Sequence, residues 1–166
     1  MITDPLIPLE ELRDPLGLPK IGGYIVAYKY RDFANIFKVS WRIDIIFLGP
    51  DHRYNAARAT FEGFLVASLI SSLEKAYQQM QILERQSFQG EYSKIIYKWP
   101  FSKIEVKASA GNICTLVWAS SDTHQFSRRL SLNEVEQSIN ILKTATQRAE
   151  HMVDTLRKLM SDCQNK

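Results

Sequence analysis

Apolar residues recur with strict three-and-four spacing near the C-terminus, and this repeat limits the possible folds more than any other feature of the chain. The positions are Leu132, Val135, Ile139, Leu142, Thr146, Ala149, Val153, Leu156 and Met160. Such a pattern over four heptads predicts one long helix with a coiled-coil-like seam. A helix of about 30 residues is about 45 Å long. It is therefore longer than a small sheet, and part of its apolar seam must be buried against another helix.

Two partners suit this seam. One is an earlier helix of the same chain, packed as an antiparallel pair, and the other is the same helix of a second subunit. The start of the helix is specified by Ser131-Leu132-Asn133-Glu134, a capping box in which the serine hydroxyl and the glutamate carboxylate each accept a hydrogen bond from a free backbone N–H.

A second amphipathic helix is predicted from Asn55 or Thr60 to Gln86. Its apolar positions are Phe61, Leu65, Leu69, Leu73, Tyr77 and Met80, which share one helical face. Gly90 provides a stop. Two long helices are therefore expected.

The segments around these helices predict strands. Residues 37–48 alternate apolar and polar side chains over most of their length, and residues 24–30 are rich in strand-forming types. Further strands are predicted at 92–99, 104–109, 113–121 and 125–130, with links too short for a crossover helix. The expected fold class is α+β: one antiparallel sheet of five to six strands in the order ββαββ(ββ)α, packed by the two helices.

Residues 1–23 contain four of the six prolines and many large apolar side chains. Proline restricts its own backbone and that of the preceding residue, so this segment cannot form a long helix. We expect an extended, Pro-rich arm on residues 1–23, packed on its own domain or on a partner, followed by a single α+β domain over residues 24–166.

Composition excludes several classes of protein. With 45% hydrophobic and 23% charged residues the chain is globular, and its formal net charge of +3 is too small to mark an obligate polyanion binder. Cys114 and Cys163 form no disulfide framework. The first residues lack the basic and apolar blocks of a secretory signal, and no apolar run spans a bilayer. We therefore expect a cytoplasmic protein without membrane contact.

No motif predicts catalysis. The three histidines lack a second ligand at metal spacing, and neither a phosphate-binding loop nor a serine nucleophile elbow is present. Asp44 with Glu105-Val-Lys107 resembles the acidic magnesium core of restriction-type nucleases. Those enzymes place the two elements on adjacent strands, whereas about 60 residues and a helix intervene here. We expect no catalytic, cofactor-binding or metal-binding residues, and we do not expect this protein to be an enzyme.

One functional hypothesis is single-stranded nucleic-acid binding on a basic, aromatic-containing sheet face, in which lysines hold phosphates and rings stack on bases. The candidate residues are Lys94, Lys98, Lys103, Lys107, Tyr92, Arg128 and Arg129. The hairpin followed by Arg128-Arg129-Leu130-Ser131-Leu132 and a long helix resembles the ending of PC4-like and whirly-like single-strand binders. The competing interpretation is that the lysines merely coat the solvated face, because alternation places Tyr97 and Trp99 on the opposite face.

The favoured hypothesis is a non-catalytic protein-interaction module: an adaptor, an inhibitor or a toxin-neutralising, immunity-type protein that acts as a homodimer. It rests on the apolar arm, the long heptad helix and the missing chemistry. The candidate interface residues are Leu6, Leu9, Leu12, Leu16, Ala149, Val153, Leu156 and Met160. The competing interpretation is a compact monomer that buries these side chains itself.

Overall fold

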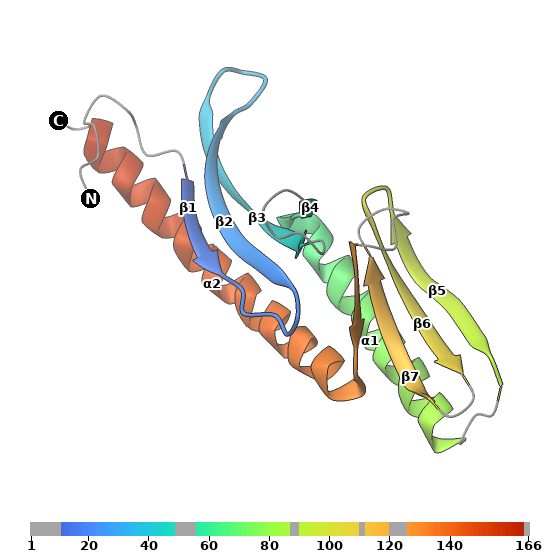
Figure 1. The fold of residues 1–166 in the computed structure, drawn as a ribbon. Coiled ribbons are helices and arrows are strands. Elements are labelled where there is room, and N and C mark those ends of the chain that lie inside the picture. The colour runs from blue at the N-terminus through green and yellow to red at the C-terminus, as the bar shows by residue number, and fades with distance from the viewer. Residues whose placement is uncertain (1–10, 49–55, 87–89, 110–111, 120–125, 165–166) are drawn as a thin grey trace.

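The computed structural model describes residues 11–48, 56–86, 90–109, 112–119 and 126–164. In these residues one order of elements, four antiparallel strands and then a helix, occurs twice (Figure 1). Sheet A contains β1 (Glu11–Pro15), β2 (Gly22–Arg31), β3 (Phe37–Leu48) and β4 (Ala56–Glu62), followed by α1 (Gly63–Arg85). Sheet B contains β5 (Tyr92–Trp99), β6 (Ser102–Ser109), β7 (Asn112–Ala119) and β8 (Ser127–Leu130), followed by α2 (Leu132–Gln164).

The α+β class, the antiparallel pairing and the two long helices are confirmed, but the single sheet and the strand order are wrong. Two strands were missed. β1 lies within the segment expected to be an arm, and β4 occupies residues assigned to the first helix. β4 pairs with β3 because Ala59 and Phe61 alternate with polar side chains and become fully buried. Tertiary pairing therefore overrides the helix propensity of its alanines.

Each helix packs mainly on the sheet of the other half of the chain. α2 lies along sheet A, whereas α1 lies along sheet B, and the two helices contact each other while running in opposite directions (Figure 1). Gly63 starts α1 against the Trp41 ring, where an added Cβ would lie 2.9 Å from a ring carbon. No helix among the described residues is long and apolar enough to span a membrane.

The α2 seam is buried within the chain. Its first half, including Val135 and Leu142, joins a core that also contains side chains of α1 and both sheets. Its second half, Val153 and Leu156, packs on Ala27 of sheet A. The predicted capping box is confirmed, because the Ser131 N–H donates to Glu134 Oε1 at 3.0 Å and the Glu134 N–H donates to Ser131 Oγ at 3.3 Å.

Aromatic side chains join the two sheets. The Phe61 ring on β4 meets Trp99 and Phe101 edge-on, with centroids 5.2 and 5.1 Å apart, and Phe47 meets Trp118 at 6.2 Å. The Trp118 indole N–H donates to Ser102 Oγ at 3.0 Å, so this polar group is satisfied in the core. One continuous core therefore fixes sheet B relative to sheet A.

Candidate functional site

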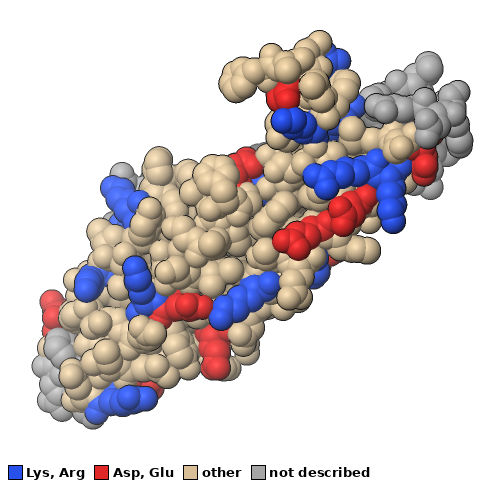
Figure 2. Space-filling view, turned by 180° about the vertical axis from the view of Figure 1, so that it is seen from behind, with Lys and Arg blue, Asp and Glu red and all other residues tan. Residues whose placement is uncertain are grey.

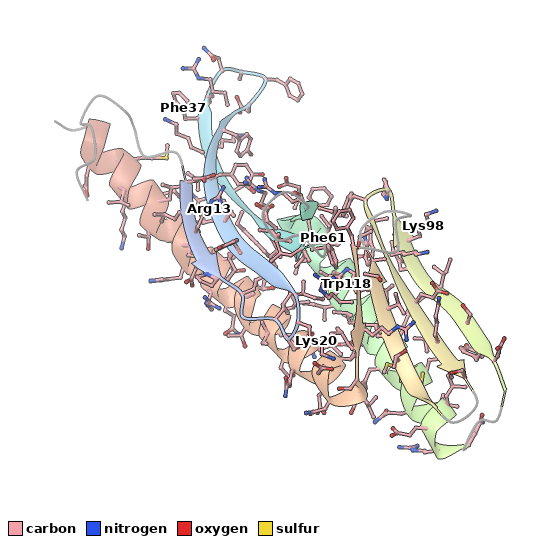
Figure 3. The ribbon with its side chains drawn as sticks, in the orientation of Figure 1. Arg13, Lys20, Phe37, Phe61, Lys98 and Trp118 are labelled. Carbon is pink, nitrogen blue, oxygen red and sulfur yellow. The ribbon has the colours of Figure 1, made fainter. Side chains whose placement is uncertain are left out.

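Four of the predicted nucleic-acid residues lie on one face of sheet B, the face turned away from the helices. In the strand register Lys98 pairs with Lys103, while Lys107 and Arg129 occupy positions of the same face on β6 and β8. We call Lys98, Lys103, Lys107 and Arg129 the basic face. Figure 3 shows Lys98 near the end of β5 that leads into β6.

The charges of the basic face are only partly neutralised. Glu105 is the acid of this face on β6, and it is mostly buried; its carboxylate accepts a hydrogen bond from Ser93 and lies 3.8 Å from the Lys103 ammonium and 3.9 Å from that of Lys107. Within the described residues, neither Lys98 nor Arg129 has an acidic partner within 4.0 Å. Two of the four cations thus share one buried carboxylate, and the other two have no acidic partner among the described residues.

The remaining predicted nucleic-acid residues lie elsewhere. A register shift at Ile96 turns β5, so Lys94 pairs with Val106 and Tyr92 with Ala108, both on the helix side of the sheet. Arg128 points toward the joint between the sheets, where it donates to the backbone oxygens of Lys20 and Leu48. Arg128 therefore links the two halves of the fold.

The edge strand of sheet B carries two exposed apolar side chains, one on the basic face and one on the inner side. Ile95 lies on the same face, opposite Glu105, and is 51% exposed. Tyr97 is 44% exposed, and its ring lies 4.5 Å from that of Trp99. Because β5 is an edge strand, the Tyr97 ring is accessible beside Lys98 although it belongs to the inner side of the sheet. This is an accessible ring next to a cation.

A second feature is the tip of the β2–β3 hairpin, which stands out from the body of the molecule (Figures 1 and 2). The sequence predicted the two strands and the turn between them, but not the exposed apolar side chains of the tip. The hairpin carries four exposed large apolar side chains, Tyr30, Phe33, Ile36 and Phe37, of which Phe33 is fully exposed. We call these four residues the apolar tip. The signal in the sequence was Phe33 and Ile36 within a turn, where small and polar residues are usual.

The turn of this hairpin is held by hydrogen bonds to the Asp32 side chain. Asp32 Oδ1 accepts hydrogen bonds from the backbone N–H groups of Ala34 and Ile36, both at 3.0 Å, and Asn35 adopts a left-handed φ of 62°. These backbone hydrogen bonds, with the Lys38 ammonium 3.0 Å away, lower the pKa of Asp32. A rigid turn therefore presents the Phe33 ring to solvent.

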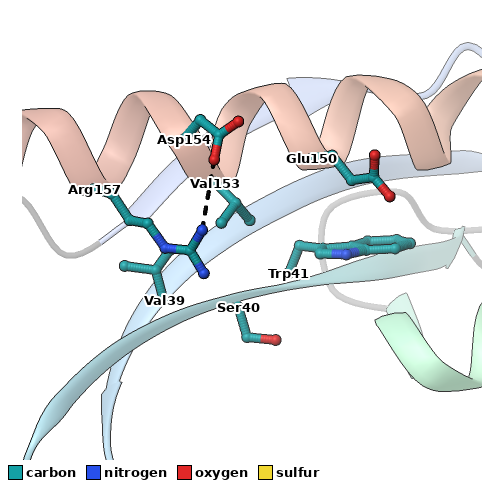
Figure 4. Close-up of a pocket in the computed structure, with 7 residues that line it drawn as sticks. All are labelled: Val39, Ser40, Trp41, Glu150, Val153, Asp154 and Arg157. Atoms are coloured by element: carbon teal, nitrogen blue, oxygen red, sulfur yellow. Dashed lines mark hydrogen bonds and ion pairs between the residues drawn. The ribbon is translucent and has the colours of Figure 1, made fainter.

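A groove runs beside the hairpin, between β3 and the second half of α2 (Figure 4). Val39, Trp41 and Val153 line its apolar floor, and the part nearest Trp41 has a volume of about 400 Å³. Glu150 and Asp154 project from α2 along this groove, and Asp154 lies 3.5 Å from Arg157. The groove thus has an apolar floor and a charged side, on which Asp154 is paired with Arg157 and Glu150 has no basic partner within 4.0 Å among the described residues.

The predicted interface residues are mostly packed inside the chain. Leu16, Ala149, Val153 and Leu156 are buried, whereas Leu12 and Met160 are partly buried against the cluster around Leu156. Leu6 and Leu9 lie outside the described residues. Met160 also lines the groove.

The outer face of sheet A carries a polar network that the sequence did not reveal. The Tyr28 hydroxyl donates to Glu62 Oε2 at 2.5 Å; burial, together with this carboxylate, raises the pKa of Tyr28 to about 12. Arg42 donates to buried Asp44 at 3.0 Å and lies over the Tyr28 ring. The charges of this face are largely paired, unlike those of the basic face.

The nuclease-like arrangement is not formed, because Asp44 lies in sheet A and Glu105 in sheet B. Among the described residues no group of three or more His, Cys, Asp or Glu could hold a metal ion. His52 and His124 lie outside these residues, and His151 is exposed on α2. Burial raises the pKa of the Cys114 thiol to about 11, which makes it a poor nucleophile.

Charges are distributed differently on the face seen from behind. Figure 2 shows blue and red side chains interleaved there, with uncharged surface between them.

Comparison of the chain with protein-family models, with curated proteins and with solved structures gave no match.

Proposed function

We propose that this protein binds single-stranded nucleic acid on the basic face of sheet B. The observation that supports this proposal is the pairing of Lys98 with Lys103, directly opposite each other on one face. Like charges opposite each other in an antiparallel pair destabilise the sheet. A phosphate bound between the two ammonium groups would remove this repulsion, and Lys107 and Arg129 would hold further phosphates.

A single strand fits this surface better than a duplex. Sheet B presents a strand face and an edge, and no described helix or loop of this half projects from that face to enter a groove of DNA. A single strand exposes its bases, which stack on accessible aromatic rings. Tyr97 belongs to the inner side of the sheet, so a strand bound on the basic face can reach its exposed ring only around the β5 edge.

The test compares two triple variants of equal charge. One is K98Q/K103Q/K107Q, and its control is K75Q/K143Q/K158Q, which removes three exposed lysines of the helices. Each variant changes the formal net charge from +3 to 0, because three of the 21 basic residues are lost. Fluorescence anisotropy with a labelled mixed-sequence oligodeoxynucleotide measures the affinity at several salt concentrations.

The first triple variant should bind more weakly and with a shallower salt dependence. Each lost phosphate contact on a single strand reduces the slope of log K against log salt by about 0.7, so the loss of three contacts should reduce it by about 2. The control should keep the wild-type slope. Equal losses in both variants, or a wild-type protein that shows no salt-dependent binding, would refute the proposal.

The second candidate function is a non-catalytic protein-interaction module that acts as a homodimer. The apolar tip supports it, because an ordered turn that exposes Phe33 and Ile36 to water is unfavourable in a free monomer. The molecular mass in solution, measured by light scattering during size-exclusion chromatography, tests this candidate. A monomer at all accessible concentrations would exclude it.

A further inference from the structure

We infer that the apolar tip of one copy docks into the groove between β3 and α2 of a second copy, and that the two copies exchange hairpins around a two-fold axis. This inference rests on the second candidate function, the homodimer, and is independent of nucleic-acid binding. It assigns the partner, the anchor residue Phe33 and the site that receives it.

The hairpin extends beyond its neighbours in the described sheet. β1 pairs with β2 only as far as Tyr28, and β4 pairs with β3 only as far as Arg42. In the part of the chain that the structure describes, residues 29–31 and 37–39 therefore pair only with each other. A two-stranded ribbon is marginally stable in water by itself. Burial against a second copy would stabilise it.

The apolar tip is preorganised for binding. The hydrogen bonds of Asp32 already fix the turn, so docking of Phe33 costs little backbone entropy. The Lys29 ammonium and the Arg31 guanidinium lie 4.3 and 4.4 Å from the Phe37 ring centroid, which holds these cations on the hairpin. Aromatic side chains presented in this way are the usual anchors of protein interfaces.

The charges of the hairpin and the groove are complementary. In residues 29–39 of the hairpin the one acid, Asp32, is paired with Lys38, which leaves the cations Lys29 and Arg31. Glu150 and Asp154 line the groove on the α2 side. In the described residues Glu150 has no basic partner within 4.0 Å, whereas Asp154 has Arg157. Arg157 also lines the groove and is paired with Asp154, so the charge left for a basic hairpin of a second copy is the carboxylate of Glu150.

The arrangement of the two surfaces suits a two-fold dimer. Phe37 and Val39 line the groove and also belong to the hairpin strand β3, so tip and groove form one continuous surface. A two-fold contact uses the same surface on both copies, with each copy giving and receiving the same element. Each hairpin can then cover the groove of the other copy.

The first experiment measures the mass of the full-length protein by light scattering over a range of concentrations. Wild-type protein should be dimeric, and F33D should weaken the dimer by roughly 30-fold or more, the loss typical of a buried anchor. I82D is the matched control, because Ile82 is 46% exposed near the C-terminal end of α1, which lies along sheet B and away from the groove, and its replacement should leave the dimer unchanged. Circular dichroism verifies that each variant is folded.

The second experiment exchanges charges. K29E/R31E and E150K/D154K should each be monomeric, because every hairpin then meets a groove of like charge. An equimolar mixture should form a heterodimer, since both hairpin–groove pairs in it have opposite charges. Monomeric wild-type protein would refute both the homodimer and this inference. A dimer that survives F33D, or a mixture that stays monomeric, would refute the docking site alone.

Discussion

Replacement of Leu156 by alanine should destabilise the fold, because this side chain fills the contact between α2 and sheet A. Leu156 is fully buried and packs with Ala27, Val153 and partly buried neighbours such as Met160. Buried Leu→Ala changes cost about 2–5 kcal/mol, with the higher losses where the cavity cannot collapse. The flexible methionine beside Leu156 allows partial collapse, so we expect a loss of about 2–3 kcal/mol.

Urea unfolding at one fixed protein concentration measures this loss, followed by far-UV circular dichroism and by tryptophan fluorescence, whose transitions should coincide. For a chain of this size the midpoint of thermal unfolding should fall by about 4–12 °C. L159A is the control, since Leu159 lies on the same helix but is 39% exposed; it should lose less than about 1 kcal/mol. Equal losses in L156A and L159A would refute the packing of the α2 seam on sheet A.

Three further changes test other parts of the structure. S131A should lose about 1 kcal/mol in urea unfolding, because Glu134 loses the acceptor of its backbone N–H; no loss would contradict the capping box. Tyr28 has a pKa raised to about 12, so its contribution to stability is complete below pH of about 10 and is lost as pH rises toward 12. In Y28F the free energy of unfolding, measured by urea unfolding at each pH, should no longer fall in this way as the pH rises from about 10 toward 12. In a C163S background, the buried Cys114 thiol should react with a thiol reagent only as fast as the protein unfolds, and rapid reaction in the native state would refute its burial.

Elements with a strong local pattern could be predicted from the sequence. β3 has the predicted bounds, 37–48, because alternation fixes both the strand and its inward face. The start of α2 was predicted from Ser131 and Glu134, since the hydrogen bonds of a capping box are local in the chain. β4 was missed because its alanines also suit a helix, and only pairing with β3 decides between the two. The division into two sheets depends on such long-range pairing throughout.

The positions of single side chains in the candidate sites could be predicted only in part, because they too depend on strand pairing. Alternation predicts that Lys94 and Lys98 share a face, but the shift at Ile96 separates them. No residue of the segment marks this bulge, because Ile96 is an ordinary strand former. Arg128 and Arg129 are adjacent in sequence, and only Arg129 is on the basic face. The seam of α2 was recognised, and α1 was one of its two predicted partners, whereas the packing of its second half on sheet A could not be predicted from periodicity.

The two proposed surfaces belong to different sheets, and this separation has a consequence for nucleic-acid binding. The apolar tip projects from sheet A, whereas the basic face lies on sheet B, so docking of hairpins leaves both basic faces of a dimer uncovered. A dimer would then present two copies of the basic face to one long strand, and its apparent affinity would exceed that of a single face through effective concentration. A strand too short to reach both faces would gain nothing. F33D should therefore weaken binding of long strands while short strands bind as before, and K98Q/K103Q/K107Q should weaken both without changing the mass of the dimer.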